Sequence, residues 1–338
     1  MAHDLDGLAS LVDGIAAETD FSGAVRIDAG GSVVLAIAHG LADRAHGVAN
    51  TVETQFATAS ATKGLTALAI VSLIEDGALD LATTARSVLG ADLPLIDDHV
   101  TIEQLLSHRS GIGDYLDEDE YDIADYVMPV PVHELATTEQ FVQVLDGHAS
   151  AFEPGERFAY NNGGFVVLAL IAERVSGIPF HDLVERRVCE RAGMHDTRFL
   201  RSDELPGRAA IGYLTADSPR TNVLHLPVRG NGDGGIYSTL DDIHTFWHAF
   251  AAGAIVSPQW VDEMTRPRSD VPDESMRYGL GFWLHETGPD VILIGSDAGV
   301  SMRTMHDPAQ QITHTVISNT SRGAWPVTRA IEEFLREK

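Results

Sequence analysis

The sequence predicts an α/β (α+β) fold in which helices from both chain ends flank a central antiparallel β-sheet, with a mostly helical second lobe inserted. Three observations predict it. Strand-like runs occur near both ends of the 338-residue chain, helical patterns fill its middle, and a helical pattern opens and closes it. We expect residues 1–85 and 235–338 to form the sheet domain, residues 86–234 to form the helical lobe, and a functional site to lie between them.

The N-terminal part supplies a helix and a hairpin. Apolar residues recur at helical spacing through the first twenty residues, which predicts an amphipathic helix. Two strand-like runs, GAVRIDAG and SVVLAIAHG, are separated by Gly30 and Gly31, as in a β-hairpin. The later segment SATKGLTALAIVSLIEDGAL predicts a long apolar helix that ends near Gly77.

The middle and the tail of the chain differ in pattern. Between about residues 100 and 195, helical segments open or close with Thr, Gly or Pro. They are TIEQLLSH, TTEQFVQVLDGH, GGFVVLALIAERVSG and PFHDLVERRVCERAG. The tail holds the strand-like runs YGLGFWLHE, DVILIGSD, SMRTMHD and QITHTVISN, followed by a helix in PVTRAIEEFLREK. An antiparallel sheet made from both ends of the chain fits this order.

Composition disfavours some binding partners and excludes an intramolecular disulfide. The net charge of −27 and the pI near 4.7 disfavour binding to nucleic acid or to acidic membrane surfaces. Cys189 is the single cysteine, so an intramolecular disulfide is excluded. No run of residues reaches the roughly 18 apolar residues of a membrane span, and the first twenty residues lack the pattern of an export signal. We expect a cytoplasmic protein without a membrane partner.

Lysine is almost absent from the chain. The two lysines are Lys63 and the last residue, Lys338, whereas arginine supplies the other 21 basic residues. Lys63 follows Ser60 by three positions, so both side chains share a face if a helix begins at or near Ser60. We expect burial to lower the pKa of Lys63, which would let it activate the serine hydroxyl as a nucleophile. The alternative is a surface lysine that happens to follow a serine.

A second polar group lies in the segment EPGERFAYNNGGFVVLALIAERVSG. Tyr160 and Asn162 occupy a short connection between a Pro-Gly turn and an apolar helix. Beside a lysine, Tyr160 would ionise more readily and act as a second proton carrier. Asn162 would orient the lysine and donate to a substrate carbonyl. The alternative is that these asparagines only cap the helix.

Together the two motifs resemble the serine β-lactamase, penicillin-binding protein and class C-type esterase superfamily. In that family a Ser-x-x-Lys motif is followed further along the chain by Tyr-x-Asn. The segments TIEQLLSHRSGI, GNGDGGIYSTLDDIHTF and YGLGFW are also similar to stretches of the family, so the resemblance extends over nearly the whole chain. It implies a β-lactamase/transpeptidase-like fold with the active site between the two lobes.

The resemblance also implies roles for individual residues. Ser60 would be the nucleophile that accepts the acyl group, Lys63 its proton partner and Tyr160 the general base, with Asn162 positioning. The backbone N–H groups of Ser60 and Gly299 would form the oxyanion hole. The resemblance implies no cofactor.

The third motif of the family is altered in this chain. Relatives carry Lys-Thr-Gly or His-x-Gly on a strand that lines the site, and its cation helps to hold a substrate carboxylate. We align this motif with Ser296, Asp297 and Ala298. Ser296 has no charge and Asp297 repels a carboxylate, which favours uncharged esters or amides, or a substrate with an amino group. Arg303 or Arg229 could supply a replacement cation.

Two other groups of residues are weaker evidence for a functional site. His244 and His248 have a zinc-compatible i, i+4 spacing, but Thr245 stands where zinc proteases have glutamate, so we expect no metal. A Gly-x-Ser-x-Gly elbow is absent from the sequence, which disfavours an α/β-hydrolase. We expect His108 to anchor a loop rather than to catalyse.

The sequence therefore predicts a serine hydrolase that forms an acyl-enzyme on Ser60. We expect an esterase or amidase that acts on small acyl substrates. A D,D-peptidase or a weak β-lactamase is the alternative within the enzymes. A catalytically silent binding protein with the same fold is the alternative from another class.

Overall fold

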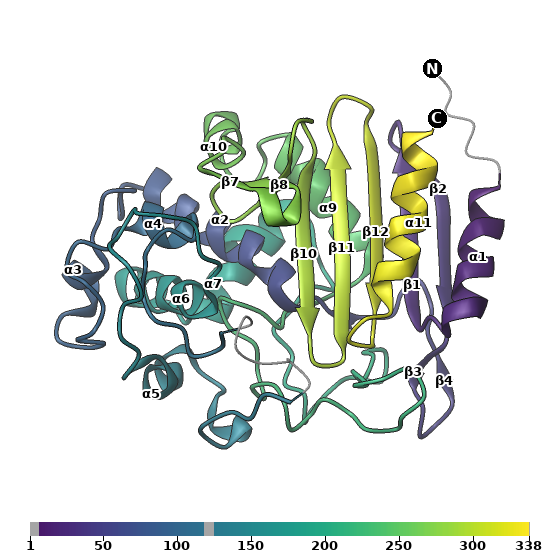
Figure 1. The fold of residues 1–338 in the computed structure, drawn as a ribbon, viewed down its shortest axis with the longest axis horizontal. Coiled ribbons are helices and arrows are strands. Elements are labelled where there is room, and N and C mark those ends of the chain that lie inside the picture. Colours follow the sequence, from purple (N-terminus) through teal and green to yellow (C-terminus); the bar gives the residue numbers. More distant parts are fainter. Residues whose placement is uncertain (1–6, 118–124, 338) are drawn as a thin grey trace.

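The central sheet is assembled from both ends of the chain (Figure 1). The computed structural model describes residues 7–117 and 125–337, and its eight-stranded sheet has the order β2-β1-β12-β11-β10-β9-β8-β7. The strands are β1 (Gly23–Ala29), β2 (Ser32–His39), β7 (Ser269–Val271), β8 (Met276–Tyr278), β9 (Trp283–His285), β10 (Val291–Asp297), β11 (Val300–Asp307) and β12 (Ile312–Ser318). All neighbouring strands run antiparallel, which confirms the predicted sheet.

The first hairpin forms where the glycine pair predicts it. Ala29 pairs with Ser32, and Gly30 and Gly31 between them have φ of 57° and 77°. A two-residue turn that follows the twist of its strands requires this left-handed backbone at both positions. Two short ribbons lie outside the main sheet: β3 (Leu41–Asp43) with β4 (Val48–Ala49), and β5 (Phe56–Ala57) with β6 (Tyr237–Ser238).

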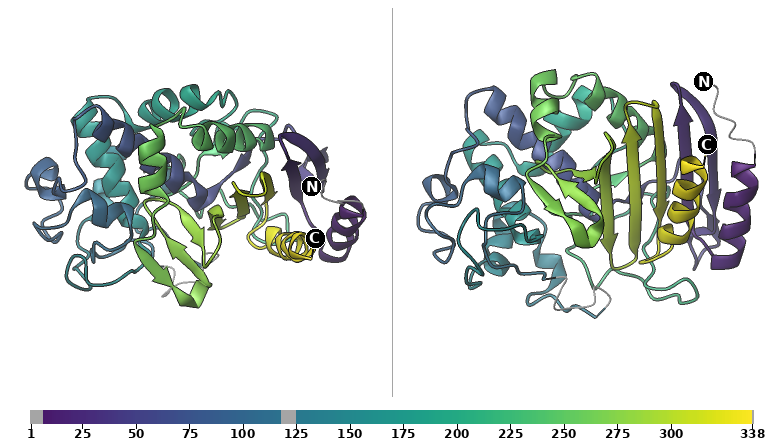
Figure 2. Two further views of the ribbon diagram at one scale, coloured as in Figure 1. Left: turned by 90° about the horizontal axis from the view of Figure 1, so that it is seen from above. Right: turned by 45° about the horizontal axis from the view of Figure 1, so that its top comes forward.

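Helices cover both faces of the sheet. The N-terminal helix α1 (Leu8–Thr19) and the C-terminal helix α11 (Ala324–Arg336) lie side by side on one face (Figure 2). Helix α9 (Leu240–Ala251) packs on the opposite face against β1 and β12, and α10 (Pro258–Met264) follows it. Alternate residues of β1 serve the two cores, since Val25 and Ile27 face α1 and α11 whereas Ala24 belongs to the other side.

The second lobe is mostly helical, as predicted. It contains α3 (Ala85–Leu89), α4 (Ile102–Leu106), α5 (Val142–Leu145), α6 (Asn162–Ser176), α7 (Phe180–Val184) and α8 (Glu190–Ala192). Two predicted helices are broken: a 3-10 turn, Thr138–Phe141, precedes α5, and a π-turn, Glu185–Cys189, separates α7 from α8. The domain boundaries near residues 85 and 234 stay a prediction.

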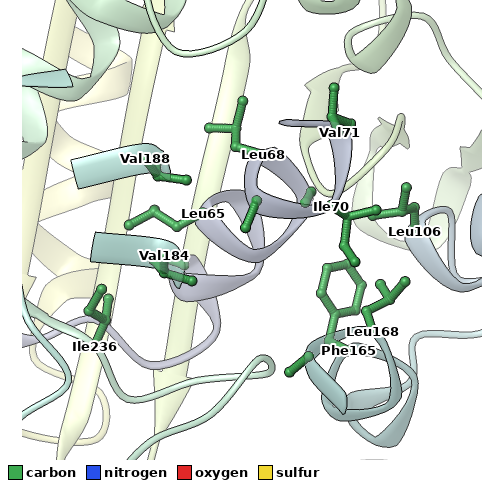
Figure 3. Close-up of a cluster of buried hydrophobic side chains, with 14 of the residues drawn as sticks. Leu65, Leu68, Ile70, Val71, Leu106, Phe165, Leu168, Val184, Val188 and Ile236 are labelled. Carbon is green, nitrogen blue, oxygen red and sulfur yellow. The ribbon is translucent and has the colours of Figure 1, made fainter. Parts of the chain in front are cut away.

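The long apolar helix α2 (Thr62–Glu75) joins the two lobes. It is buried from Thr62 to Leu73, and its apolar side chains contact α6 and α7 (Figure 3). A helix that is hydrophobic on all sides belongs inside a protein, so α2 gives a rigid base to residues at its N-terminus. Among the described residues no single helix is both long and apolar enough to cross a bilayer.

Candidate active site

Ser60 lies in a strained turn that leads into α2. A 3-10 turn, Ala59–Ala61, precedes the helix, and Ala59 has a φ of 45°, which is unfavourable for a residue with a Cβ. The hydroxyl of Thr62 donates a hydrogen bond to the carbonyl oxygen of Ala59 at 2.7 Å and holds the turn. The start of the helix is therefore at Ser60, as predicted, but in 3-10 rather than α geometry. Such strain is common where a reactive side chain must be presented in one orientation.

Lys63 is buried within reach of Ser60. The side chain points into the protein with the residue 2% exposed, and its Nζ donates to Ser60 Oγ at 3.0 Å. Nζ also donates to Asn162 Oδ1 at 2.7 Å and to the backbone carbonyl oxygen of Asp233 at 2.8 Å. These acceptors hold the amine beside the serine and offset the cost of burying it. A surface lysine is excluded.

The asparagines at the start of α6 have separate tasks. Asn161 is the N-cap, because its side chain accepts a hydrogen bond from the N–H of Gly164 at 2.6 Å. Asn162 instead turns its amide oxygen towards Lys63. Helix capping thus accounts for Asn161 alone.

Tyr160 lies beside the lysine. Lys63 Nζ is 4.9 Å from the centroid of the Tyr160 ring. Trp283 stacks on that tyrosine, with ring centroids 6.1 Å apart and an interplanar angle of 13°. The tyrosine ring is therefore in contact with both a cation and an indole.

His108 supports this tyrosine segment. Its Nδ1 accepts the backbone N–H of Asn161 at 3.1 Å, and its ring lies 4.4 Å from the Tyr160 ring between centroids. Burial, followed by the charge of Lys63, holds the pKa of His108 well below its usual range. His108 is thus neutral, as suits a residue that anchors a loop.

These groups open onto one cleft of about 430 Å³. The predicted residues Ser60, Tyr160, Asn162 and Ser296 all line it. The other lining residues are apolar or charged: Phe158, Ala159, Val271, Met276, Trp283 and Ile294, with Asp117, Arg157, Asp273 and Glu274. The hydroxyl of Ser60 and the phenol of Tyr160 therefore line one cavity, and the buried amine of Lys63 lies within hydrogen-bond distance of that serine.

A protein-family model matches nearly the whole chain. The family model described as Beta-lactamase matches residues 8–333. The chain belongs to the beta-lactamase family. The matched range includes both lobes and all the residues of the cleft, so the resemblance seen in the motifs is confirmed.

Individual relatives cover different shares of this beta-lactamase-family protein. Penicillin-binding protein 4* of Bacillus subtilis (strain 168) is 28% identical over 307 residues, which cover 86% of this chain and 66% of that protein. Esterase EstB of Burkholderia gladioli is 28% identical over 283 residues, covering 75% and 71%. The crystal structure of a penicillin-binding protein from Bacillus halodurans has a TM-score of 0.89 at 34% identity, covering 96% and 99% of the two chains. The chain thus spans about two thirds of the length of these curated relatives.

In this beta-lactamase-family protein the structure favours an earlier position on β10 for the altered third motif than the predicted one. The motif's glycine is needed where the strand passes close to another segment. Gly295 meets that requirement, because a Cβ there would lie 2.0 Å from the carbonyl oxygen of Thr58, beside the nucleophile turn. Ala298, which we aligned with the glycine, lies in the turn after β10 instead. This close approach favours Gly295 over Ala298 as the motif's glycine, so we infer a register with Leu293, Ile294 and Gly295 in place of Ser296, Asp297 and Ala298.

In the register that Gly295 favours, Leu293 and Ile294 would occupy the positions of the family's cation and threonine. Leu293 is 4% exposed and packs against Gly64 of α2, where an added Cβ would lie 2.6 Å from its Cδ2. Ile294 lines the cleft. Both replacements are apolar, so the strand offers no charge to a substrate carboxylate, as the sequence already indicated.

The edge of β10 faces the cleft at Ser296. Asp297 and Val300 close a two-residue turn, and the pair that closes such a turn is hydrogen-bonded. Bonding alternates along antiparallel strands, so the N–H of Ser296 points away from β11. On that side β9 pairs with β10 as far as Ile292. The N–H of Ser296 is therefore directed to the cleft that Ser296 and Ser60 share.

Gly299 does not have this geometry. Its N–H donates a hydrogen bond to Ser321 Oγ at 2.8 Å, within the turn between β10 and β11. An N–H used in this way is unsuited to an oxyanion, so the prediction of Gly299 as the second donor is wrong. That prediction depended on aligning Ala298 with the glycine of the third motif.

The arginines proposed as replacement cations have other partners. Arg303 forms an ion pair with Glu332 of α11 at 2.6 Å, and Arg229 donates to the carbonyl oxygen of Phe199 at 3.0 Å. Arg157 lines the cleft and lies over the ring of Phe152, 4.2 Å from its centroid. The motifs did not identify Arg157, although it lies three residues before Tyr160 in the PGERFAY segment.

Two buried carboxyl groups near Lys63 were also missed. Burial raises the pKa of Asp114 to about 6, despite backbone hydrogen bonds and the charge of Lys63, which lower it. Burial likewise raises the pKa of Asp233, against the lowering effects of Lys63 and of a hydrogen bond from Tyr115. Asp233 lies in the family-like segment GNGDGGIYSTLDDIHTF and Asp114 lies outside the quoted segments, and for both the signal that identifies them is proximity to the lysine in three dimensions.

The histidines considered for zinc have different surroundings. His244 is 1% exposed with its Nδ1 3.0 Å from Asp28 Oδ2, whereas His248 is exposed. Across the described part of the chain, His, Cys, Asp and Glu do not gather in a group of three or more that could hold a metal ion. His244 belongs to the packing of α9 on the sheet.

Proposed function

We propose that this beta-lactamase-family protein is a serine hydrolase that acts on small esters or amides through an acyl-enzyme on Ser60. The observation that carries the proposal is the buried amine of Lys63, which lies 3.0 Å from Ser60 Oγ and 4.9 Å from the ring centroid of Tyr160, beneath a cleft that Ser60 and Tyr160 both line. A serine hydroxyl becomes an effective nucleophile when a neighbouring base accepts its proton. The likeness to esterase EstB supports this reaction class.

The geometry suggests an order of proton transfers. Ser60 Oγ attacks the substrate carbonyl carbon while its proton passes to the pair formed by Lys63 and Tyr160. The backbone N–H groups of Ser60 and Ser296 stabilise the oxyanion. The proton then moves to the leaving alcohol or amine, and the C–O or C–N bond breaks to leave the acyl-enzyme. Water activated by the same pair releases the acid and restores Ser60.

The cleft favours substrates without a carboxylate next to the reacting carbonyl. Leu293 and Ile294 replace the family's cationic motif, while Asp117, Asp273 and Glu274 line the same cleft. Carboxylates in a cleft repel an anionic substrate and attract an amino group. We therefore propose uncharged or amine-bearing acyl groups as the substrate class, without a cofactor.

A D,D-peptidase or weak β-lactamase is the second candidate. Arg157 favours it, because this cation lines the cleft and could hold the terminal carboxylate of such substrates. The likeness to penicillin-binding proteins supports the same candidate. The relative rates of ester and cephalosporin hydrolysis rank the two candidates.

The protein should be incubated with p-nitrophenyl butyrate, a chromogenic cephalosporin and a fluorophosphonate, with Ser60→Ala as the control. We expect ester turnover and a mass increase on Ser60 with the fluorophosphonate, both absent in the variant. Faster hydrolysis of the cephalosporin than of the ester would reverse the substrate ranking. Absence of both turnover and adduct would favour a catalytically silent binding protein.

A further inference from the structure

We propose that Asp114 and Tyr115 are positioning residues that hold the two acceptors which keep the Lys63 amine beside Ser60. The inference rests on the proposed serine hydrolase function. Both residues belong to the segment after His108, on a loop that lies against the start of α6. Neither belongs to the motifs through which the family was recognised. Asp114 supports Asn162, and Tyr115 supports Asp233, and both of these accept a hydrogen bond from Lys63. We call each of these two hydrogen-bond chains an arm.

The first arm runs from Asp114 through Asn162. The carboxylate of Asp114 accepts the backbone N–H groups of Asn162 at 2.6 Å and Gly163 at 2.8 Å. The carbonyl oxygen of Leu116 accepts the Nδ2 group of Asn162 at 3.0 Å. With the backbone and the amide nitrogen both fixed, the amide oxygen of Asn162 is directed at Lys63 Nζ, 2.7 Å away.

The second arm runs from Tyr115 through Asp233. The hydroxyl of Tyr115 donates to Asp233 Oδ2 at 2.5 Å, and Tyr115 is 6% exposed. Asp233 lies in a tight turn closed by hydrogen bonds between Asn231 and Gly234 at 2.9 and 3.2 Å. The carbonyl oxygen of Asp233 accepts Lys63 Nζ at 2.8 Å. Tyr115 thus fixes the side chain of the residue whose backbone holds the amine.

The two arms matter because Lys63 is long and flexible. An amine that exchanges protons with Ser60 must stay within hydrogen-bond distance of it, and small displacements of reacting groups reduce rates strongly. The loop places one acceptor on each side of Nζ. Loss of either arm should slow the chemical step and leave substrate binding unchanged.

Tyr115→Phe tests the second arm with little change in shape. We expect kcat for p-nitrophenyl butyrate to fall about tenfold, since a hydrogen bond to a charged group is lost, while KM stays within about twofold. Tyr213→Phe is the matched control. Tyr213 is also buried, at 2% exposure, and its hydroxyl accepts the N–H of Arg44 at 2.7 Å. The control should lose similar thermal stability and keep the wild-type kcat.

Asp114→Asn tests the first arm through the pH dependence of kcat. The titratable groups that interact with Asp114 are Lys63 on α2 and Tyr115 on the same loop. Protonation of Asp114 removes an acceptor from the N–H groups of α6, so the wild-type kcat should fall as the pH drops through its pKa of about 6. Asp114→Asn should lower kcat about tenfold at pH 8 and lose this acidic dependence.

The outcomes separate the inference from the proposed function. Absence of ester turnover and of a Ser60 adduct in the wild type would overturn both. An active wild type with Tyr115→Phe within twofold of its kcat would overturn the inference alone. An equal fall of kcat in Tyr213→Phe would also overturn it, since the effect would then reflect general stability. If Asp114→Asn does not fold, Tyr115→Phe and its control decide.

Discussion

Lys63 is a buried amine that is held by three hydrogen-bond acceptors. Its amine donates to Ser60, Asn162 and Asp233 from inside the protein. Arginine, which supplies nearly all the other basic side chains, has a guanidinium that keeps its proton at any pH a protein tolerates. If Lys63 exchanges a proton with Ser60, as proposed, arginine could not replace it at this position.

Lys63→Arg should lower kcat for ester hydrolysis by about 10³-fold or more, because the guanidinium cannot accept the Ser60 proton. Stopped assays with p-nitrophenyl butyrate, together with the rate of fluorophosphonate labelling, measure this loss. Lys63→Met, which keeps the length but removes the amine, is the matched variant and should be equally impaired. Retention of a tenth of the wild-type kcat by the arginine variant would show that Lys63 is not the proton partner.

The site residues divide into those that sequence can and cannot predict. Ser60 and Lys63 are predictable because i, i+3 positions meet on any helical turn. Tyr160 and Asn162 are predictable through their motif. The Asp233 carbonyl and the Tyr115 hydroxyl are not, because their positions depend on contacts between segments 118 or more positions apart. Local spacing gave no information about either contact.

The hairpin of β10 and β11 shows the same limit at the scale of an element. Its strands and turn are where the pattern predicts them, yet the close approach of Gly295 favours another register for the motif on β10. A strand alternates its faces at every residue, so a shift along it exchanges the residues that face the nucleophile. The glycine that passes close to Thr58 favours one register, and only the packed structure shows that approach.

Gly295→Ala should destabilise the protein by about 2 kcal/mol and lower ester turnover, because the new Cβ would lie 2.0 Å from the carbonyl oxygen of Thr58. Gly207→Ala is the matched control: nothing lies within 4 Å of a Cβ there, and we expect a change below about 0.5 kcal/mol. Urea unfolding of the three proteins gives both values. Equal stability of Gly295→Ala and wild type would contradict the close approach.

Among the helices, length and flanking residues decide how accurately the sequence predicts where a helix begins and ends. The apolar helix α2 and the helix after the Asn pair were predicted close to their observed bounds, since long periodic segments leave little choice. The segment before residue 146 was predicted as one helix but forms a 3-10 turn and a four-residue helix. Short segments depend on tertiary contacts more than on their own propensity.

At the scale of the whole molecule, a buried charge network ties the sheet to the helix on its inner face. Asp28 of β1 accepts hydrogen bonds from Arg26 at 2.9 and 3.0 Å, and His244 of α9 lies 3.0 Å from it. Burial acts to raise the pKa of Asp28, but the hydrogen bonds from His244 and Arg26 outweigh it and hold that pKa well below its usual 3.8. The folded state thus favours the ionised carboxylate.

Asp28→Asn should cost about 2 kcal/mol of unfolding free energy at pH 7, since it removes the charge that Arg26 faces. Because the folded pKa lies below the unfolded one, this contribution is complete above the unfolded pKa and is lost as the pH falls through the folded pKa. The difference between variant and wild type should therefore shrink below about pH 4. Denaturant titrations at several pH values measure it.

Asp241→Asn is the control for this network. Asp241 also pairs with Arg26, at 2.6 Å, but its side chain is 81% exposed. An exposed pair contributes little to stability, so its loss should change the unfolding free energy by less than about 1 kcal/mol at any pH. A larger loss in Asp241→Asn than in Asp28→Asn would contradict the assignment.

The general architecture was predictable because strand-like runs at both ends and helical patterns between them leave few arrangements. The order of strands was not, since no local pattern states that β1 lies beside β12. That pairing depends on the entire chain having folded back on itself. One face of β1 carries Val25 and Ile27, which belong to the core under α1 and α11, whereas the other carries Ala24 together with the charged pair Arg26 and Asp28.

The pairing of β1 with β12 also sets the order in which the protein can be completed during synthesis. Ser22 and Asn319 are hydrogen-bonded although they are 297 positions apart. A chain that emerges from the ribosome N-terminus first has the β1–β2 hairpin long before it has β12, so one edge of β1 stays unpaired while the rest is translated. Such an edge can pair with other chains. Once β12 has been translated it pairs with β1 and covers that edge, which leaves β2 and β7 as the edge strands of the sheet.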